Sequence, residues 1–548
     1  MLEQGVEYLF GLPGGSVIVL FDELYEAPLK TILVRHEQGA GHMADGYARV
    51  TGKVGVCVAT SGPGATNLVT AIATAYMDSV PVVAITGQVK THLIGNDAFQ
   101  EADLTGITRP VTKHNYLVKD ARELGRIVRE AFYIASTGRP GPVLIDLPAD
   151  VTAQVVEGEI DTTMQLPGYK PTAGGGHSLQ IQRAAEAINA SERPVLYVGG
   201  GVITAGASEE LRTVARKGNI PVTTTLMGLG TFPETEDIAL GMLGMHGTVY
   251  ANYAVTNCDL LIAVGARFDD RITGKLDEFA PGARIIHMDI DPASIGKNVA
   301  VDIPVVGDAK KMLTELSGLV EDRERKEWLG RIAEWKRDFP LAYKLEGDVV
   351  KPQAVVEAVY EVTDGKAVVV TDVGQHQMWA AQYYKYSEPR TFLSSGGLGT
   401  MGFGLPAAIG AQFGRPDRTV VLITSDGSIQ MNIQEMATAV GNRLPLKIVL
   451  LDNGYLGMVR QWQELFFNKR YSHTYLADKS PNFVKVAEAY GGRGILVEKM
   501  DGVRPALEQA MEVDDGPVLM DFHTAPEENV FPMVPAGQAI DRMLSGMA

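Results

Sequence analysis

Residues 418–453 read RTVVLITSDGSIQMNIQEMATAVGNRLPLKIVLLDN: a β-branched run, a turn, an amphipathic stretch and a second β-branched run. Similar short runs alternate with helical patterns along the rest of the chain, at 54–60, 80–86, 142–147, 193–199, 259–265, 284–290 and 367–373. Strands separated by amphipathic helices predict right-handed βαβ units. The fold class that follows is α/β, with doubly wound parallel sheets that carry helices on both faces.

Two stretches interrupt this alternation and divide the chain. Residues 152–177 are rich in Pro, Gly and Thr, which is typical of a linker. Residues 321–349 hold a charged helix followed by a connection without periodicity. We therefore expect three domains, at residues 1–165, 178–325 and 350–535. A length of 548 residues is enough for each to bury its own core.

The two outer segments resemble each other in sequence. The stretches that start at Thr60 and Thr424 both leave a strand through a turn that begins Thr-Ser. Each continues into a helix that we expect to open at an asparagine, Asn67 or Asn432, and then to a proline that leads the next strand. Chance similarity among α/β units would explain this. So would a duplicated domain whose two copies face each other across one cofactor.

The charge balance excludes one class of partner. The chain has 49 basic and 66 acidic residues, a net charge of −17, and a pI near 5.1. No basic field is present to displace counterions from nucleic acid, so nucleic-acid binding is excluded as its function. Glycine is frequent, at 60 residues, against an average usage of ~7%. Glycine-rich turns beside cofactors would account for the excess.

The cysteines and the lengths of the apolar runs indicate the cellular compartment in which we expect the protein. Cys57 and Cys258 are predicted to be small buried hydrophobes in a reducing compartment, not a disulfide or metal site. No apolar run reaches ~18 residues, so no membrane span is expected. The N-terminal MLEQGVEYLFG is unlike a signal peptide. We expect a cytoplasmic protein, or an organellar one if an upstream transit segment precedes this chain.

The turn in the opening stretch predicts a metal site. Ser425-Asp426-Gly427-Ser428 follows one strand, and Asn453 ends the next strand 27 residues after Asp426. A turn that leaves a parallel strand and opens a helix binds anions through backbone N–H groups. Carboxylate and amide oxygens suit a hard cation, so Mg²⁺ bridging to a diphosphate fits this sparse set. A lone Ser-Asp-Gly would be a plain turn.

These residues resemble a known pattern, because thiamine-diphosphate enzymes carry a Gly-Asp-Gly motif and, further along the chain, Asn-Asn. Here the motifs read SDG and DN, and the two metal-contacting positions are kept. The resemblance implies that Asp426, Asn453 and the backbone carbonyl of Tyr455 hold Mg²⁺. It also implies that further residues bind thiamine diphosphate. These are Gly374, Gln375, His376, Gly427 and Ser428 at the diphosphate, with Gly399 and Met401 at the aminopyrimidine and ring junction.

Glu37 has two interpretations. It lies in RHEQGA (35–40), where a strand ends and a helix begins. A carboxylate there is normally a favourable charge at the helix N-terminus, contributing up to ~1 kcal/mol. By resemblance, Glu37 is instead the carboxyl group that hydrogen-bonds N1′ of the aminopyrimidine and so activates the cofactor. Since metal and activator then lie in different domains of like fold, the cofactor is expected between two subunits.

The resemblance narrows to the catalytic subunits of acetohydroxyacid (acetolactate) synthases. It is carried by FGLPGG (10–15), RHEQGAGHMADGYAR (35–49), SGPGATN (61–67), DAFQEAD (97–103), RPGPVLIDLP (139–148), MLGMHG (242–247), GARFDDRITGKL (265–276), DVGQHQMW (372–379) and GMVRQWQELF (457–466). Domains 1–165, 178–325 and 350–535 would bind the aminopyrimidine, FAD and the Mg²⁺-diphosphate. The implied flavin-binding residues are Gly199, Gly200, Gly201, Met245, His246, Arg267, Asp269, Asp270 and Asp289. A weak glycine motif and a surface ion-pair cluster are the alternatives.

The family's reaction is decarboxylation of pyruvate and transfer of the two-carbon unit to a second pyruvate or to 2-oxobutanoate, which serves branched-chain amino-acid synthesis. By resemblance, Gln100 contacts the reacting groups, Arg271 binds the acceptor carboxylate, and Trp462 lines the acceptor pocket beside Phe99 and Met245. A homodimer or homotetramer is expected, with a small regulatory subunit as a further partner. The alternatives are a flavin-dependent pyruvate oxidase, a catabolic synthase without flavin, a glyoxylate carboligase, which lacks the activating glutamate, and a degenerate scaffold.

Overall fold

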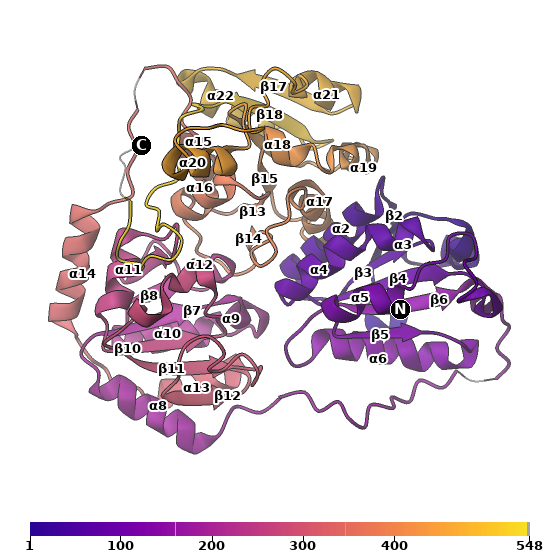
Figure 1. Cartoon of the computed structure of the whole chain (residues 1–548), viewed down its shortest axis with the longest axis horizontal. Helices are drawn as coiled ribbons and strands as arrows, with labels where there is room; N and C mark the ends of the chain where they lie inside the picture. Colours follow the sequence, from indigo (N-terminus) through magenta and orange to yellow (C-terminus); the bar gives the residue numbers. More distant parts are fainter. Residues whose placement is uncertain (159, 346, 545–548) are drawn as a thin grey trace.

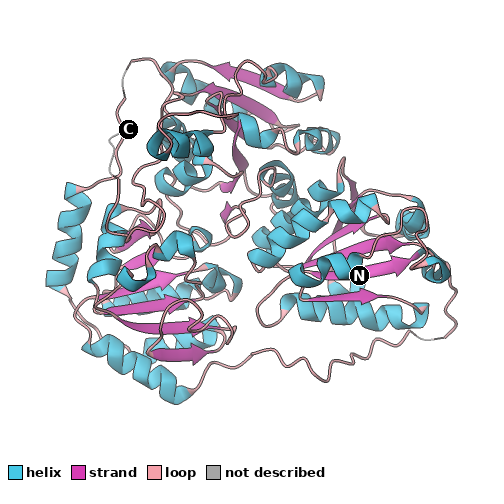
Figure 2. Cartoon of the chain, viewed as in Figure 1, coloured by secondary structure: helices cyan, strands magenta, loops and turns pink. Residues whose placement is uncertain are grey.

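The computed structural model describes residues 1–158, 160–345 and 347–544. Within these ranges the chain forms three domains, each with one six-stranded parallel sheet (Figure 1). Helices flank each sheet on both faces (Figure 2). The predicted α/β class with doubly wound parallel sheets is therefore confirmed. The segment 153–177 runs between the first two domains without a helix or strand among its described residues.

The N-terminal sheet has the order β2-β1-β3-β4-β6-β5. Its strands are β1 (Tyr8–Gly11), β2 (Lys30–Leu33), β3 (Gly55–Ala59), β4 (Val82–Gln88), β5 (His114–Leu117) and β6 (Val143–Pro148). From β1 the chain first adds β2 on one side and then β3 on the other. That reversal opens a crevice at the carboxyl ends of β1 and β3, where doubly wound sheets bind ligands.

The C-terminal sheet repeats this order as β14-β13-β15-β16-β18-β17. Its strands are β13 (Val368–Thr371), β14 (Phe392–Leu393), β15 (Val420–Ser425), β16 (Lys447–Asp452), β17 (Arg493–Val497) and β18 (Val518–His523). The identical order favours duplication over chance similarity. One detail of the predicted echo is wrong: the first helix after β3 is α3 (Pro63–Asn67), so Asn67 ends it. Proline at the first helical position has no N–H to leave unpaired, which explains the earlier start.

The central sheet has a different order, β12-β11-β10-β7-β8-β9. Its strands are β7 (Pro194–Val198), β8 (Val222–Thr224), β9 (Ala239–Met242), β10 (Leu260–Val264), β11 (Arg284–Asp289) and β12 (Ile303–Val306). The reversal point lies between β7 and β10, as in dinucleotide-binding sheets. Helix α14 (Lys326–Asp338) is the predicted charged helix, and it buries Trp328, Ile332 and Trp335.

The two outer domains meet along helices α2 (Glu37–Thr51) and α17 (Gly404–Gly414). A Cβ on Gly46 would lie 2.2 Å from the carbonyl oxygen of Ala407, and one on Gly410 would lie 2.0 Å from that of Met43. Glycine inside a helix costs about 1 kcal/mol relative to alanine. These two are explained by the close approach of the helix backbones.

Among the described residues, no helix has both the length and the apolar character needed to cross a membrane. Cys57 and Cys258 are both free and buried. Burial raises the pKa of each thiol to about 12, so neither is a ready nucleophile.

Candidate functional site

A pocket opens at the reversal point of the C-terminal sheet, where β13 and β15 end. Helix α16 (Gln375–Tyr383) begins beside it, and no side chain caps that helix at Gly374. Its first N–H groups therefore remain available to an anion. Six of the residues predicted to bind cofactor or metal line this pocket, namely Gly374, Gln375, His376, Met401, Ser428 and Asn453.

Asp426 begins the short helix α18 (Asp426–Ile429) directly after β15. Its side chain is fully buried, and neither carboxylate oxygen has a hydrogen-bond partner. Burial, with the nearby charge of Asp452, raises the pKa of Asp426 well above its usual range. A buried carboxylate without a partner is costly unless a cation neutralises it. This donor chemistry fits the predicted Mg²⁺.

Asn453 follows β16, the strand next to β15, so Asp426 and Asn453 lie at the same sheet edge. Asn453 Oδ1 accepts a hydrogen bond from the backbone N–H of Tyr455 at 3.1 Å. An amide oxygen has two lone pairs, so one remains for a metal ion. Asn453 Nδ2 donates to Gln375 at 3.3 Å and thereby joins the metal edge to the pocket. The role of the Tyr455 carbonyl stays a prediction.

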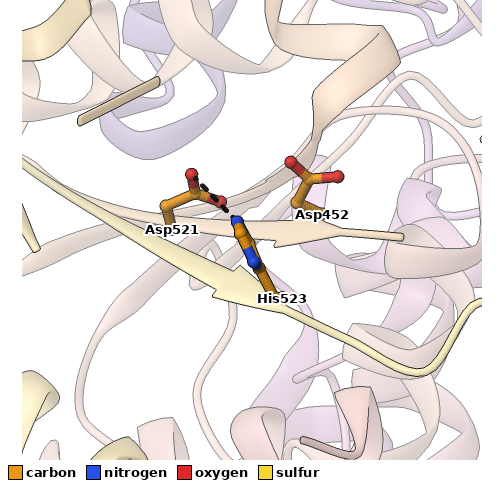
Figure 3. Close-up of side chains that lie close together, drawn as sticks. All are labelled: Asp452, Asp521 and His523. Carbon is orange, nitrogen blue, oxygen red and sulfur yellow. Dashed lines mark ion pairs between the residues drawn. The ribbon is translucent and has the colours of Figure 1, made fainter. Parts of the chain in front are cut away.

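A further group of titratable residues lies at this edge and was not predicted from the sequence. Asp452 ends β16, while Asp521 and His523 lie on the adjacent β18 (Figure 3). One ligand atom of each lies within 4.8 Å of the others, and His523 Nε2 is 3.7 Å from Asp521 Oδ2. The neighbouring carboxylate of Asp521 raises the pKa of His523. The register of β16 with β18 pairs Asp452 with His523, and no local sequence motif predicts that pairing.

The other predicted cofactor residues in or beside this pocket carry no charge. His376 Nε2 is buried without a partner, and burial lowers the pKa of this imidazole to about 3. Gly427 lies close to Leu456, which a Cβ would approach to 2.8 Å, and Gly399 has φ +69°. A pocket with free N–H groups, an unpaired imidazole and an adjacent unpaired carboxylate fits a metal-bound diphosphate.

Glu37 is the first residue of α2, but it does not cap that helix. His36 is the cap, through Nδ1, which accepts from Gln38 N at 3.1 Å. The Glu37 side chain is buried, and Oε2 accepts from Asn67 Nδ2 at 3.0 Å. A carboxylate held inside the domain argues against the simple helix-charge interpretation. Its position fits the predicted hydrogen bond between the Glu37 carboxyl group and the aminopyrimidine ring of thiamine diphosphate.

Gln100 lies at the same edge of the N-terminal sheet. Its backbone has φ +58°, and a Cβ on Gly62, just beyond β3, would lie 2.8 Å from the Gln100 carbonyl oxygen. Neighbouring Phe99 exposes 88% of its surface. Neither Glu37 nor Gln100 is among the residues that line the C-terminal pocket. Within the described part of one chain, the two halves of the predicted site are therefore not brought together.

The predicted acceptor residues lie at the surface. The Arg271 side chain is 64% exposed, and its Nη1 lies 3.5 Å from Met245 Sδ. Trp462 is half-buried on α20 (Gly457–Phe466), with its ring centroid 5.2 Å from that of Phe466. Arg271 thus lies next to Met245, while the side chains of Phe99 and Trp462 both keep surface exposed to solvent.

The predicted flavin residues follow several strands of the central sheet: the glycines and Arg267 follow β7 and β10 at the reversal point, whereas Met245 and His246 follow the edge strand β9. Gly199, Gly200 and Gly201 follow β7, and a Cβ on Gly199 would lie 2.2 Å from the Gly265 carbonyl oxygen beyond β10. The buried Thr224 Oγ1 and His246 Nδ1 have no partner. Thr224 ends β8, which pairs with β7, so its unpaired hydroxyl lies beside the switch point and fits a dinucleotide there.

The acidic members of that set have other local partners too. Asp269 caps α12 (Asp270–Thr273) by accepting from Arg271 N at 3.0 Å, while Asp270 forms an exposed pair with Arg271 at 3.8 Å. These contacts match the ion-pair alternative for the cluster. Arg267 precedes it, and its carbonyl accepts from the hydroxyl of Tyr197 at 2.7 Å. Asp289 ends β11, and burial raises its pKa to about 6.

Comparison with known proteins agrees with this layout. Three family models match, described as the N-terminal TPP (thiamine pyrophosphate, that is, thiamine diphosphate) binding domain, the central domain and the C-terminal TPP binding domain of thiamine pyrophosphate enzymes. They cover residues 1–107, 181–316 and 372–522.

Curated relatives match along almost the whole chain. An acetolactate synthase of Mycobacterium bovis is 51% identical over 99% of this chain and 89% of its own length. The acetolactate synthase large subunit of Haemophilus influenzae is 49% identical over 99% and 96%. The probable large subunit of Methanocaldococcus jannaschii is 52% identical over 97% and 92%. This chain belongs to the acetolactate synthase large-subunit family of thiamine pyrophosphate enzymes.

Proposed function

We propose that this chain forms 2-acetolactate from two molecules of pyruvate, and 2-aceto-2-hydroxybutanoate when 2-oxobutanoate is the acceptor. The reaction is the first common step of valine, leucine and isoleucine synthesis. The observation that carries the proposal is the pocket at the ends of β13 and β15. It sets free N–H groups beside the buried, unpaired Asp426 in a chain related throughout to acetolactate synthases.

Thiamine diphosphate, when bound, supplies a carbon nucleophile and an electron sink for decarboxylation. The residues of this chain hold it in place. Asp426, Asn453 and the Tyr455 carbonyl would bind Mg²⁺, and the start of α16 with Ser428 would bind the diphosphate. Glu37 would hydrogen-bond N1′ of the aminopyrimidine with its buried carboxyl group, which Asn67 holds in place through Oε2.

The second substrate needs a cation and an apolar wall. Arg271 would bind the acceptor carboxylate as a bidentate fork, since its guanidinium is exposed and only loosely paired with Asp270. Trp462 and Phe99 would pack the alkyl group of the acceptor. Gln100, whose backbone is fixed against Gly62, would hydrogen-bond the reacting oxygen.

The assembly follows from the separation of the two half-sites. Glu37 does not line the pocket of its own chain, so a second copy would supply it. The smallest active unit is then a homodimer, which can pair further into a tetramer. A small regulatory subunit is a further partner, proposed because several relatives are named large subunits.

FAD is proposed for the crevice between β7 and β10, beside which Thr224 at the end of β8 has an unpaired hydroxyl. Mass spectrometry of the cofactors released from purified protein tests this directly. FAD together with thiamine diphosphate supports the proposal. Thiamine diphosphate alone would favour a catabolic synthase.

The reaction itself is tested by pyruvate turnover without an electron acceptor. The proposal predicts one CO₂ and one acetolactate for every two pyruvates consumed. A requirement for an electron acceptor, with acetate or acetyl phosphate as the product, would favour the pyruvate oxidase alternative instead.

A further inference from the structure

The loop that carries Gly399 and Met401 is held from the other outer domain of the same chain. It spans residues 394–403, between β14 and α17. Asp78, just after helix α4 (Val69–Met77) in the N-terminal domain, accepts hydrogen bonds from two consecutive backbone N–H groups of this loop. Gly396 N donates to Asp78 Oδ2 at 3.1 Å and Gly397 N to Asp78 Oδ1 at 2.7 Å.

Arg49 completes the contact. Its Nη2 donates to Asp78 Oδ2 at 2.9 Å, and its Nη1 donates to the carbonyl oxygen of Ser394 at 2.9 Å. Nε pairs with Asp45 one turn earlier on α2, and the guanidinium carbon lies 5.3 Å from the ring centroid of Phe403. The Arg49 side chain is 9% exposed and those of Asp45 and Asp78 are fully buried. Charged hydrogen bonds shielded from water are the strong kind.

A third contact reaches the far end of the loop. The hydroxyls of Thr74 and Thr400 are 2.8 Å apart, and Thr400 is the residue between Gly399 and Met401. The loop also lies tightly on its support, because a Cβ on Gly397 would lie 2.8 Å from Asp78 Oδ1. We call Arg49, Asp78 and Thr74 the clasp.

The loop needs such support because of its composition. Residues 395–402 read SGGLGTMG, and glycine leaves the backbone more freedom than any other residue. Its own domain holds both ends. Gln377 Nε2 donates to Ser394 Oγ at 2.6 Å at the N-terminal end. At the C-terminal end, Gly402 N donates to Asp372 at 2.8 Å and Asn432 donates to the Gly402 carbonyl at 2.7 Å. The described cross-domain bonds to residues 394–400 come from the clasp. A loop that is ordered beforehand binds its ligand without losing that freedom on binding.

We propose that Asp78, with Arg49 and Thr74, is a positioning group that holds the 394–400 loop in the shape that receives the aminopyrimidine half of thiamine diphosphate. This rests on the proposed function. Each N-terminal domain then serves two sites. It supplies Glu37 to the site of a second copy and fixes the cofactor loop of its own chain through Asp78.

The test compares Asp78→Asn with Asp259→Asn. Asp259 is the matched control, since it also accepts from two consecutive backbone N–H groups, those of Glu192 and Arg193, but in the central domain. Amide hydrogen exchange is measured on the full-length protein without cofactor. Affinity for thiamine diphosphate with Mg²⁺ is measured by tryptophan fluorescence. Asp78→Asn should speed exchange in 394–400 at least about tenfold and weaken cofactor binding about tenfold, the loss of a charged hydrogen bond. Asp259→Asn should change neither.

Normal exchange in the 394–400 loop, or unchanged cofactor affinity, would overturn the proposal, as would equal effects in Asp259→Asn. If Asp78→Asn does not fold, Thr74→Val decides, because it removes only the hydroxyl contact to Thr400. It should weaken binding severalfold and loosen the same peptide, and wild-type values for either would overturn the proposal. Wild-type protein that binds no thiamine diphosphate would instead refute the proposed function.

Discussion

The N-terminal and C-terminal domains share one strand order but carry opposite halves of the proposed site. In the N-terminal copy, Glu37 begins the helix after the second strand, and Gly62 follows Thr60-Ser61 after the third. In the C-terminal copy, Gly404 begins the corresponding helix, and Asp426 follows Thr424-Ser425. Each copy thus has glycine where the other has its carboxylate. Function lies in the residues at the strand ends, while the shared sheet only brings them to one edge.

The two domains also differ in how they surround an aspartate that occupies the same place in the last strand of each. β6 reads VLIDLP and β18 reads VLMDFH. Asp146 of β6 is satisfied by Thr86 Oγ1 at 2.8 Å and Gln88 Nε2 at 3.0 Å. Asp521 of β18 faces Asp452 and His523 instead (Figure 3). One domain hydrogen-bonds its buried acid to uncharged side chains, and the other places its acid beside Asp452 and His523.

The largest expected effect breaks the N-terminal half of the site. Glu37→Gln keeps the size of the side chain but removes its ionisable carboxyl group. We expect pyruvate consumption to fall by about 10²–10⁴-fold, the usual contribution of a proton-handling group. Mg²⁺ affinity should stay at the wild-type value, because the predicted ligands Asp426 and Asn453 lie in the C-terminal domain. Calorimetric titration with Mg²⁺ and a CO₂ assay measure the two. A near-normal rate would contradict the role of Glu37.

The second prediction concerns the contact between the N-terminal and C-terminal domains of one chain. Gly410→Ala places a Cβ 2.0 Å from the Met43 carbonyl oxygen, where two backbones meet. We expect a loss of about 3 kcal/mol in unfolding free energy, at the upper end for overpacking. Gly330→Ala in α14 is the control, because nothing lies within 4 Å of its Cβ. It should be neutral or stabilising by up to ~1 kcal/mol. Equal denaturation midpoints for both variants would show that the helices separate freely.

A third prediction concerns Asp146, the buried acid of the N-terminal domain that Thr86 and Gln88 hydrogen-bond. Burial raises its pKa to about 6, so the folded state holds the proton more tightly than the unfolded chain does. Its contribution to stability is present at low pH and is lost as the pH rises from ~4 to about 6. The shift from 3.8 to about 6 corresponds to about 3 kcal/mol in all, at about 1.4 kcal/mol per pKa unit. Asp146→Asn should therefore remove about 2 kcal/mol of pH dependence between pH 4.5 and 7.5. Urea unfolding at pH 4.5 and 7.5 measures it. Identical pH profiles for both proteins would show that Asp146 ionises normally.

The smallest expected effect concerns acceptor choice. In both copies an aromatic side chain lies beyond the fourth strand, Phe99 after β4 and Trp462 after β16. Trp462→Leu should lower the preference for 2-oxobutanoate over pyruvate by about tenfold, within the range for one methylene in an apolar pocket. Acetolactate formation should persist. A competition assay with both acceptors gives the product ratio, and an unchanged ratio would place Trp462 in the core only.

The sequence predicted strands well where they are buried on both faces. The runs at 142–147 and 446–452 correspond to β6 and β16, whose residues are almost all buried. The predicted runs did not include seven strands: β5, β8, β9, β12, β14, β17 and β18. Five of these (β5, β9, β12, β14 and β17) are edge strands, where a continuous apolar run is not required. Of the two interior strands, β8 has only three residues, and β18 was missed although it is almost fully buried. Strand order also escaped prediction, because it depends on pairing between distant segments.

The candidate site divides in the same way. Residues inside local motifs, such as Gly374-Gln375-His376, were predicted, and the structure gathers them in one pocket. Asp521, His523 and Asp78 were missed. Asp521 acquires its neighbours through the register of β16 with β18, and Asp78 acquires its partners from a loop more than 300 residues away. Contacts of this kind have no local sequence pattern.

The central claim is that one cofactor is shared by the N-terminal copy of one chain and the C-terminal copy of another. Co-expression of Glu37→Gln and Asp426→Asn chains, with different affinity tags, tests it most directly. In a two-fold dimer each mixed pair would contain one site with both carboxylates intact. A random mixture of two inactive variants should therefore recover about a quarter of wild-type pyruvate turnover, concentrated in the doubly tagged fraction. If that fraction stays inactive while both chains fold and pair, each site is built from a single chain and the claim is wrong.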